Sequence, residues 1–398
     1  MFKSSNLNSL NNDNSSKTKN FISRIKIQNF RSYKDIDLNI ANDHVILYGP
    51  NGSGKTNLLE AISLLAPGRG LRSSKKEFFP YRLTPSESYH EEWAIHFTIN
   101  NGQKQKEIST GIKAKNNNLR SSRLYKVDGN LSKQNEVLSL VSINWLTPQM
   151  NNIILGPESL RRSFFDRMIA GLDPSHLGRL KKLEKLYRER AQLIERNVKD
   201  ESWLSVIERE ISQISVAVIV ARQNLTSKLD KIMANPNNSF FPAVRILWIG
   251  KIEEWLKENP ALYAEDMMAD YLKKIRHEKN FNSCGPSYSA LRVWHVSSGM
   301  TSEYCSTGQQ KNILISMVLA YSKLLSSYKK IFPILLLDEV SAHLDSKHFQ
   351  ALFDEALSCS SQIWMTGNDK NTFKKLDYSG NPQYFVVNDS IITQPVDL

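Results

Sequence analysis

Cysteine is scarce in this sequence, which has only Cys284, Cys305 and Cys359 among its 398 residues. An odd number at wide spacing suits neither a disulfide framework nor a zinc knuckle, so the composition favours a reducing, cytoplasmic setting. Long apolar runs are also missing. The longest ones, such as residues 331–337 around Pro333, fall far short of the roughly 18 residues that a membrane span needs. The sequence therefore predicts neither a disulfide-stabilised protein nor a membrane-spanning helix.

Acidic residues are outnumbered by basic ones. The chain has 52 Lys and Arg against 40 Asp and Glu, a net charge of +12. Such a surplus favours a polyanionic partner such as nucleic acid or an anionic membrane surface. Residues 101–126 hold seven Lys and Arg and a single Glu. This stretch is either the solvated face of a hairpin or part of a duplex-binding face, and in the second case the candidate contacts are Lys113, Lys115, Arg120 and Arg123.

The start of the chain predicts a tail followed by strands. Residues 1–20 are mainly Asn, Ser and Lys, which predicts disorder and matches neither a secretory signal nor a transit peptide. Alternating apolar residues at Ile25 and Ile27 and over residues 37–40 predict strands. Residues 44–48 read as a short buried strand that ends at Gly49.

A glycine-rich segment follows that strand and matches the pattern G-x-x-x-x-G-K-[ST]. It precedes a predicted helix over residues 57–65. Glycines let successive amide N–H groups face the phosphates of a nucleotide, while the lysine reaches the β and γ phosphates and the threonine hydroxyl ligates Mg²⁺. The predicted loop for ATP and Mg²⁺ consists of Gly49, Pro50, Asn51, Gly52, Ser53, Gly54, Lys55 and Thr56.

A second motif lies almost 300 residues further along the chain. The apolar residues 334–337 are followed by Asp338 and Glu339. Taken alone, an apolar run followed by two acidic residues is equally typical of an ordinary core strand that leaves the sheet. Paired with the phosphate loop, Asp338 would hold Mg²⁺ and Glu339 would polarise the attacking water, so that Lys55, Asp338 and Glu339 form the predicted catalytic set. The next residues resemble the D-loop of ABC-type ATPases, Val340-Ser341-Ala342-His343-Leu344-Asp345.

A third motif opens the apolar helix predicted over residues 312–325 and resembles the ABC signature. A serine hydroxyl, glycine amides and a helix N-terminus form an anion site. The resemblance implies that Ser306, Gly308 and Gln309 complete the nucleotide site of a second subunit. The alternative is simple helix capping, with a serine N-cap and a glutamine at the third helical position. The motif reads Cys305-Ser306-Thr307-Gly308-Gln309-Gln310-Lys311.

Together these motifs resemble the RecF family of DNA-repair ATPases, relatives of the SMC-like ATPases, from Phe21 to the last strand. The resemblance implies that Arg31 approaches the nucleotide phosphates. It also implies that Gln149 occupies a position that senses Mg²⁺ and the γ phosphate. Further segments similar to that family are Asn29-Phe30-Arg31-Ser32-Tyr33, Asn57-Leu58-Leu59-Glu60-Ala61-Ile62, Pro67-Gly68-Arg69-Gly70-Leu71-Arg72, Trp145-Leu146-Thr147-Pro148-Gln149-Met150, Arg161-Arg162-Ser163-Phe164-Phe165-Asp166-Arg167 and Trp364-Met365-Thr366-Gly367.

For function, the resemblance implies an ATP-dependent homodimer that binds single- and double-stranded DNA. It implies work in DNA replication, recombination and the SOS response, with RecR and RecO as partners in loading RecA, and a weak, DNA-stimulated ATPase. One segment departs from the family: many relatives have Gly-Pro-His-Arg with a following Asp, whereas this chain reads Gly285-Pro286-Ser287-Tyr288-Ser289. The alternative function is an ATPase subunit that drives membrane transport, which the wide spacing from Ser306 to Asp338 disfavours.

The phosphate loop and the acidic pair must meet in space, which defines the expected architecture. The predicted fold class is α/β, with an ABC-type ATPase head built from residues 21–160 and 286–398. A mainly helical arm is expected as an insert over residues 161–285. Leucines at helical spacing predict two long helices there, each of about 25 to 30 residues and some 40 Å in reach. A strand over residues 240–249 and a helix over residues 261–275 should follow.

Overall fold

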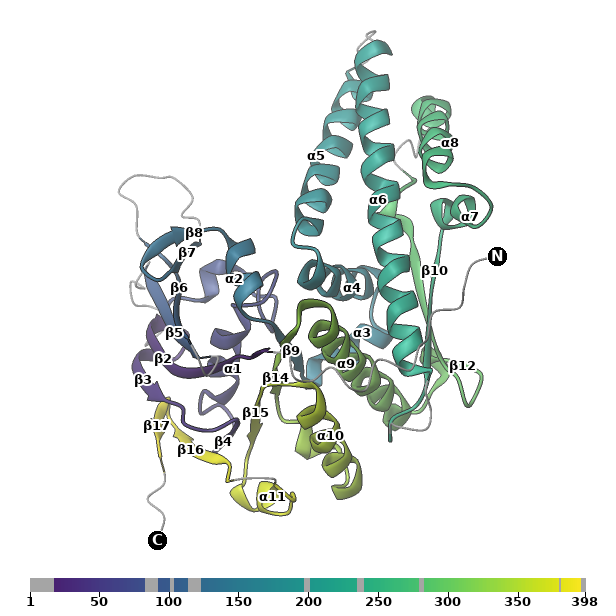
Figure 1. Cartoon of the computed structure of the whole chain (residues 1–398). Coiled ribbons are helices and arrows are strands. Elements are labelled where there is room, and N and C mark those ends of the chain that lie inside the picture. The colour runs from purple at the N-terminus through teal and green to yellow at the C-terminus, as the bar shows by residue number, and fades with distance from the viewer. Residues whose placement is uncertain are drawn as a thin grey trace. The chain divides into compact units, whose positions relative to one another are not determined.

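The computed structural model describes residues 18–82, 92–100, 104–113, 123–196, 201–234, 240–278, 283–378 and 381–394 (Figure 1). The chain divides into two compact units. The first unit combines Met1–Pro148 with Val318–Leu398, and the second unit is Gln149–Met317. The expectation of one unit assembled from both ends of the chain, with an inserted and mainly helical unit, is therefore confirmed. The predicted limits of the arm, residues 161 and 285, stay a prediction. The compact helical unit, Gln149–Met317, begins earlier and ends later than that arm.

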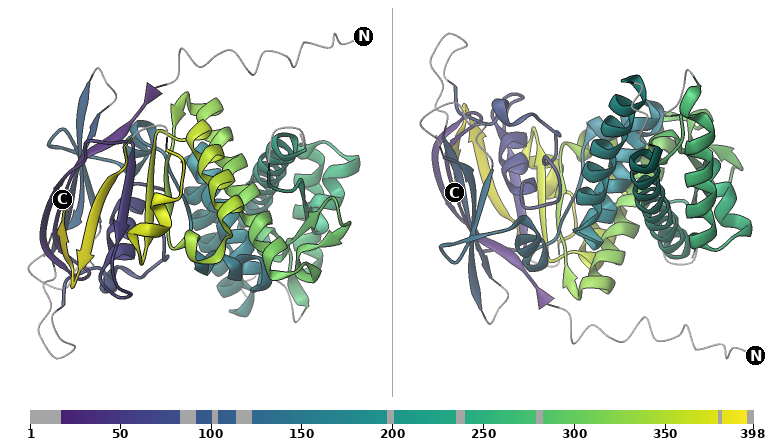
Figure 2. Two further views of the ribbon diagram at one scale, coloured as in Figure 1. Left: turned by 90° about the horizontal axis from the view of Figure 1, so that it is seen from below. Right: turned by 90° about the horizontal axis from the view of Figure 1, so that it is seen from above.

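The first unit contains a largely parallel six-stranded sheet in the order β17-β16-β4-β15-β14-β9. Its inner strands are buried on both faces, as the continuous burial of β14 and β15 shows, and this explains their unbroken apolar sequences. The view from below in Figure 2 shows strands from opposite ends of the chain side by side, because β16 pairs with β4. The strands are β4 (His44–Tyr48), β9 (Ile143–Leu146), β14 (Ile334–Leu337), β15 (Gln362–Gly367), β16 (Gln383–Asn388) and β17 (Ile391–Thr393).

A second, antiparallel sheet of the first unit has the order β3-β2-β5-β6-β7-β8. Its strands alternate between buried and more exposed residues, as in Trp93–Asn100, so one face is covered and the other faces solvent. The predicted strand at Ile25 and Ile27 is confirmed as part of β2. The strands are β2 (Phe21–Phe30), β3 (Tyr33–Asn39), β5 (Trp93–Asn100), β6 (Gln105–Ile112), β7 (Leu124–Val127) and β8 (Asn130–Ser132).

The remaining elements of the first unit are short helices and one small sheet. The predicted disordered tail lies outside the described residues as far as residue 17. Thr18–Lys19 form β1, which pairs with β13 (Ile331–Phe332), so regular structure begins slightly before Phe21. The helices are α1 (Lys55–Ser63), α2 (Gln134–Leu140), α10 (Ser346–Cys359) and α11 (Lys370–Lys374), and α9 (Thr307–Lys329) runs from the second unit into the first.

The second unit is mainly helical, as predicted. The two long helices α5 (His176–Glu195) and α6 (Glu201–Met233) lie side by side (Figure 1) and have 20 and 33 residues. The predicted leucine pattern packs Leu183 and Leu186 against Ile211 and Ile219 in one apolar core. The other elements are α3 (Asn151–Leu155), α4 (Glu158–Leu172), α7 (Lys251–Glu258), α8 (Ala261–Lys274), β10 (Val244–Ile249), β11 (Ala290–His295) and β12 (Met300–Thr301).

A buried charge cluster joins three parts of this helical core. Glu208 on α6 is 2% exposed and accepts hydrogen bonds from Arg190 Nε at 2.9 Å and from Arg276 Nη2 at 2.6 Å. Arg190 also donates to the carbonyl of Leu272 at 2.7 Å. Because both guanidinium groups are buried, the carboxylate is needed to compensate them. Within the part of the chain that is described, no helix meets the length and hydropathy of a membrane span.

Candidate nucleotide-binding site

The glycine-rich loop connects β4 to α1, as the sequence predicts. Gly49 has φ +151°, and a Cβ added there would lie 2.0 Å from the carbonyl oxygen of Val387 on β16. Gly54 has φ +111°, and its added Cβ would lie 2.8 Å from the Tyr33 hydroxyl, which donates to the Gly54 carbonyl at 2.9 Å. Only glycine adopts these angles without strain or close contact, so the chain can curl tightly between strand and helix.

Lys55 is the first residue of α1, and its side chain returns over the loop. Its Nζ donates to the carbonyl oxygens of Gly49 at 2.6 Å and Pro50 at 2.7 Å, and to Asn368 Oδ1 at 3.4 Å. The residue is only 3% exposed. Burial lowers the pKa of Lys55, and the nearby carboxylates of Glu339 and Asp338 oppose this shift. The ammonium group is thus held by neutral oxygens, and a phosphate is a stronger acceptor for it.

The sheet order brings Thr56 and Asp338 together. The carboxyl ends of β4 and β14 lie at one edge of the sheet, with β15 between them. Thr56 Oγ1 donates to Asp338 Oδ1 at 3.0 Å, and Thr366 Oγ1, from the end of β15, donates to the same oxygen at 2.8 Å. Burial raises the pKa of Asp338, whereas these two hydroxyls act in the opposite direction. The predicted metal-binding hydroxyl and carboxylate are therefore neighbours.

Glu339 follows Asp338 in an unusual backbone conformation. Its φ of +49° is in the left-handed region, which a glutamate adopts at an energetic cost and which is frequent at functional sites. The Glu339 amide donates to Thr366 Oγ1 at 2.8 Å. Thr366 thus bridges both acidic residues. Thr366 belongs to one of the segments similar to the RecF family, but its role depends on contacts with the neighbouring strand and is not visible in local sequence.

The side chains at this edge fit a Mg²⁺-bound nucleotide. Oxygen atoms from hydroxyl and carboxylate groups are the ligands that Mg²⁺ prefers, and Thr56 and Asp338 supply one of each. Ser53 is 4% exposed, and within the described parts of the chain its hydroxyl has no hydrogen-bond partner. A buried polar group of this kind costs free energy unless something binds it. The loop therefore has an unused polar atom where the motif places phosphate.

Arg31 lies in a different environment from the one that the family resemblance implies. Its Nε and Nη2 each donate to the carboxylate of Glu60 at 2.8 Å, and its Nη1 donates to the Phe78 carbonyl at 2.8 Å. Glu60 on α1 is fully buried, and Arg72 also pairs with it at 3.2 Å. Arg31 is thus the counter-ion of a buried carboxylate. Its approach to nucleotide phosphates stays a prediction.

The other predicted nucleotide-binding residues belong to the second unit. Gln149 is exposed in a 3₁₀ turn, Pro148–Met150. At the start of α9, the Ser306 amide donates to Gln309 Oε1 at 2.9 Å, and the Gln309 amide donates to Ser306 Oγ at 3.3 Å. This is the reciprocal capping arrangement that we considered as the alternative. Ser306 and Gly308 are nevertheless exposed, so capping leaves them accessible to a ligand.

The candidate DNA-binding residues have different environments. Lys115 and Arg120 lie outside the described residues, and Lys113 is exposed just after β6. Arg123 is partly buried; its guanidinium donates to Thr110 Oγ1 at 2.8 Å and to the carbonyl of Leu64. Burial lowers the pKa of Arg123. This arginine connects β6 and α1, which favours the structural interpretation for it.

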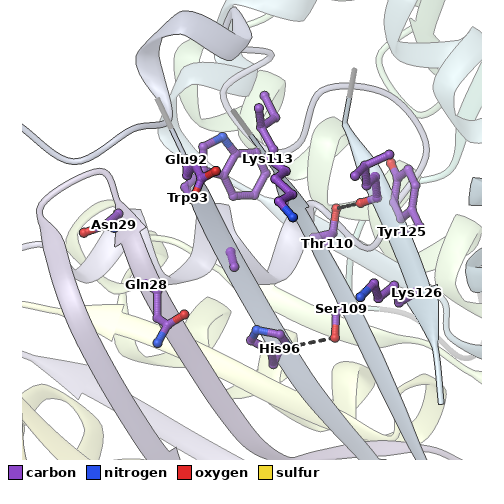
Figure 3. Close-up of a pocket in the computed structure, with 14 residues that line it drawn as sticks. Gln28, Asn29, Glu92, Trp93, His96, Ser109, Thr110, Lys113, Tyr125 and Lys126 are labelled. Atoms are coloured by element: carbon purple, nitrogen blue, oxygen red, sulfur yellow. Dashed lines mark hydrogen bonds between the residues drawn. The ribbon is translucent and has the colours of Figure 1, made fainter. Parts of the chain in front are cut away.

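A groove of about 300 Å³ crosses the antiparallel sheet between β2 and β7 (Figure 3). Figure 3 shows the side chains of Lys113 and Lys126 over this groove. On its floor, His96 Nδ1 and Ser109 Oγ are 2.7 Å apart. Burial and the neighbouring Lys26 both lower the pKa of His96. Lys126 was part of the basic stretch in the sequence, and the strand register explains why it joins Lys113 here.

Comparison with known proteins extends the match well beyond these motifs. A family model described as the RecF/RecN/SMC N terminal domain matches residues 21–385. The DNA replication and repair protein RecF of Rhizobium rhizogenes is 34% identical, over 94% of this chain and 98% of its own length. The RecF protein of Mesorhizobium japonicum is 35% identical, over 92% of this chain and 96% of its own length.

Solved structures show the same fold. The recombination mediator protein RecF in complex with ATPrS, in the RecFOR pathway, superimposes with a TM-score of 0.80 and 22% identity. The match covers 96% of this chain and 100% of that one. The RecF-ATP structure gives a TM-score of 0.79. Since the sequence relatives are matched almost end to end and the nucleotide-loop geometry agrees with the motifs, the chain belongs to the RecF family of DNA replication and repair ATPases.

Proposed function

We propose that this chain is a cytoplasmic, ATP-dependent DNA-binding protein of recombinational repair and replication maintenance. ATP joins two heads into a homodimer that clamps duplex DNA beside single-stranded gaps, and slow, DNA-stimulated hydrolysis opens the dimer. The names of its relatives support repair and the RecFOR pathway as the setting. RecR and RecO are the proposed partners in loading RecA.

The observation that carries the ATPase proposal is the hydrogen bond between Thr56 and Asp338, beside the curled-back Lys55. Lys55 binds the β and γ phosphates, while Thr56 and Asp338 hold Mg²⁺. The bound metal neutralises phosphate charge. Glu339 orients water and accepts its proton, and its backbone is held by the hydrogen bond that its amide N–H donates to Thr366 Oγ1.

Dimerisation is proposed to use the exposed start of α9. Ser306 Oγ accepts one hydrogen bond from the Gln309 amide, and a hydroxyl retains one proton to donate. Together with the Gly308 amide and the positive end of a 23-residue helix, this arrangement favours an anion. The γ phosphate held by a second subunit has the right charge. In a two-fold dimer each subunit would complete the other's site.

Sedimentation velocity, measured with and without ATP and duplex DNA, tests both the catalytic role of Glu339 and the nucleotide site shared between two subunits. The wild type should dimerise with ATP, and Glu339→Gln should accumulate the dimer, because shape and metal binding remain while the catalytic base is lost. Ser306→Arg should stay monomeric and still bind nucleotide. Ser327→Arg, at another exposed serine of α9, is the matched control and should dimerise. Dimerisation of Ser306→Arg would disprove the shared site.

A further inference from the structure

A cavity of about 530 Å³ is lined by residues of the second unit alone. Residues from α4, α5 and α6 and from the segment 284–288 line it. That segment is where the sequence departs from the family pattern. The volume falls within the range of small-molecule sites. The nucleotide mechanism uses none of its side chains.

Part of the cavity lining is apolar. Leu180, Leu183 and Pro286 contribute to it. Tyr187 is fixed because its hydroxyl donates to the Cys284 carbonyl at 2.6 Å. Gly285 has φ +119°, and an added Cβ there would lie 2.2 Å from the Tyr187 hydroxyl. The close approach of Tyr187 to Gly285 therefore fixes the position of this part of the lining.

A second part of the lining, around Arg222 and Asp166, is a network of paired charges. Arg222 is 2% exposed and binds both oxygens of Asp166, at 2.9 and 2.8 Å, while its Nη1 donates to the Pro286 carbonyl at 2.7 Å. Asp166 also bonds His176 Nε2 at 2.9 Å. Each charge here has a close partner, so this part of the lining supports the cavity and has little charge left for a ligand.

Two other arginines of the lining have no such close carboxylate partner among the described residues. Arg162 Nη1 donates to the neutral carbonyl of Ser289 at 2.9 Å, and among the described residues no carboxylate lies within ion-pair distance of it. Burial and the neighbouring Arg222 both lower the pKa of Arg162, and the carboxylates of Glu158 and Asp166 oppose this shift without pairing directly with it. Arg188 has its nearest carboxylate, Glu184, at 3.9 Å, with both side chains largely exposed. Such a pair is weak, so an anion would stabilise both guanidinium groups.

An exposed aromatic ring lies beside these cations. Tyr288 is 59% exposed at the end of a 3₁₀ turn, Pro286–Tyr288. Lys181 and Lys185 are also exposed on α5, at the i−7 and i−3 positions from Arg188, so they share its helix face. Exposed aromatic rings next to lysine and arginine are the pattern by which proteins bind single-stranded nucleic acid.

We propose that this cavity binds one unpaired nucleotide of single-stranded DNA. The base stacks on Tyr288 and against the apolar part of the lining, and Arg162 and Arg188 bind the adjoining phosphates. A base within a duplex cannot enter a cavity without leaving its stack, so the site selects unpaired DNA. This assignment rests on the proposed function at gapped DNA and adds to it a way of recognising the single-stranded side.

Fluorescence anisotropy on the full chain with ATP tests the assignment, with labelled oligo(dT) and a blunt duplex as probes. Tyr288→Ala should weaken oligo(dT) binding by about 5- to 150-fold, since stacking on one base is worth about 1–3 kcal/mol. Duplex affinity should not change. Tyr263→Ala removes a tyrosine that is 55% exposed on α8 and is the matched control, without effect on either probe.

Arg162→Gln provides a second, independent variant. It should weaken oligo(dT) binding and reduce its salt dependence by roughly 0.7 in the log–log slope, the value for one phosphate contact on a single strand. On an oligonucleotide of abasic sites, Tyr288→Ala should lose its effect while Arg162→Gln keeps its own. Equal losses on duplex and oligo(dT), or none on oligo(dT) in either variant, would overturn the inference.

Two outcomes separate this inference from its premise. If the wild type dimerises with ATP and binds duplex, but Tyr288→Ala binds oligo(dT) normally, only the nucleotide cavity is wrong. If the wild type binds neither DNA, the proposed function fails with it. Poly(Glu) that displaced oligo(dT) at equal concentration in the wild type, and not in Tyr288→Ala, would reassign the cavity to an acidic protein segment and overturn the proposal.

Discussion

Replacing Thr366 by valine should separate nucleotide binding from hydrolysis. Thr366 is 1% exposed at the end of β15; its hydroxyl donates to Asp338 at 2.8 Å and accepts from the Glu339 amide at 2.8 Å. Valine has nearly the same shape and forms neither bond. The change therefore removes the tether of the left-handed Glu339 and leaves the backbone of α1 and its loop intact.

The expected magnitude follows from these two bonds. A hydrogen bond to a charged group contributes about 1.5–3 kcal/mol, and an amide left without a partner costs about 1–3 kcal/mol. The additional buried methyl group offsets roughly 1 kcal/mol. We expect the free energy of unfolding to fall by about 2–4 kcal/mol. We expect kcat for ATP hydrolysis to fall roughly 100-fold, because a misplacement of about 1 Å has such an effect.

Thr366→Ser is the matched control, since it keeps the hydroxyl and loses only a methyl group. It should cost about 1 kcal/mol of stability and leave kcat nearly unchanged. Urea denaturation monitors the stability, phosphate release monitors turnover, and a fluorescent ATP analogue monitors binding. Nucleotide affinity should remain within a few-fold in both variants. Turnover at the wild-type rate in Thr366→Val would refute the role of Thr366 in positioning Glu339.

Three further predictions concern other parts of the chain. Glu208→Gln should lower the unfolding free energy by about 3–5 kcal/mol, since it leaves the buried Arg190 and Arg276 uncompensated. The control is Asp266→Asn, which removes an exposed ion pair with Arg209 and should cost under about 1 kcal/mol in the same urea titration. Burial raises the pKa of Asp230 to about 6, so the stability that this carboxyl contributes is fully present below its ordinary pKa and is lost as pH rises to about 6; the difference in unfolding free energy between the wild type and Asp230→Asn should change over that range, and parallel pH profiles of the two proteins would contradict the assignment. Alanine at Lys113 and Lys126 should flatten the log–log salt dependence of duplex binding by up to about 0.9 per lost contact, and an unchanged slope would show that these lysines only solvate the sheet.

The sequence was sufficient for features set by short segments. The spacing from Gly49 to Thr56 specifies a tight turn between a strand and a helix, because the required backbone angles and the lysine position are local. The strand over residues 44–48 and the helix over residues 261–275 also depend on local periodicity, and β4 and α8 agree with them closely. Length and motif order sufficed for the α/β class and for a head built from both ends.

Tertiary structure decided which distant residues meet. Thr366 bridges Asp338 and Glu339 only because β15 lies between β4 and β14, and strand order is not encoded in local spacing. Arg123 reads as one more cation in a basic stretch, yet its guanidinium binds Thr110 and Leu64. Arg31 likewise pairs with Glu60, which lies 29 residues away. Composition gives only the number of charged residues, whereas burial and hydrogen-bond partners determine whether a charged side chain stabilises the fold or remains available to a ligand.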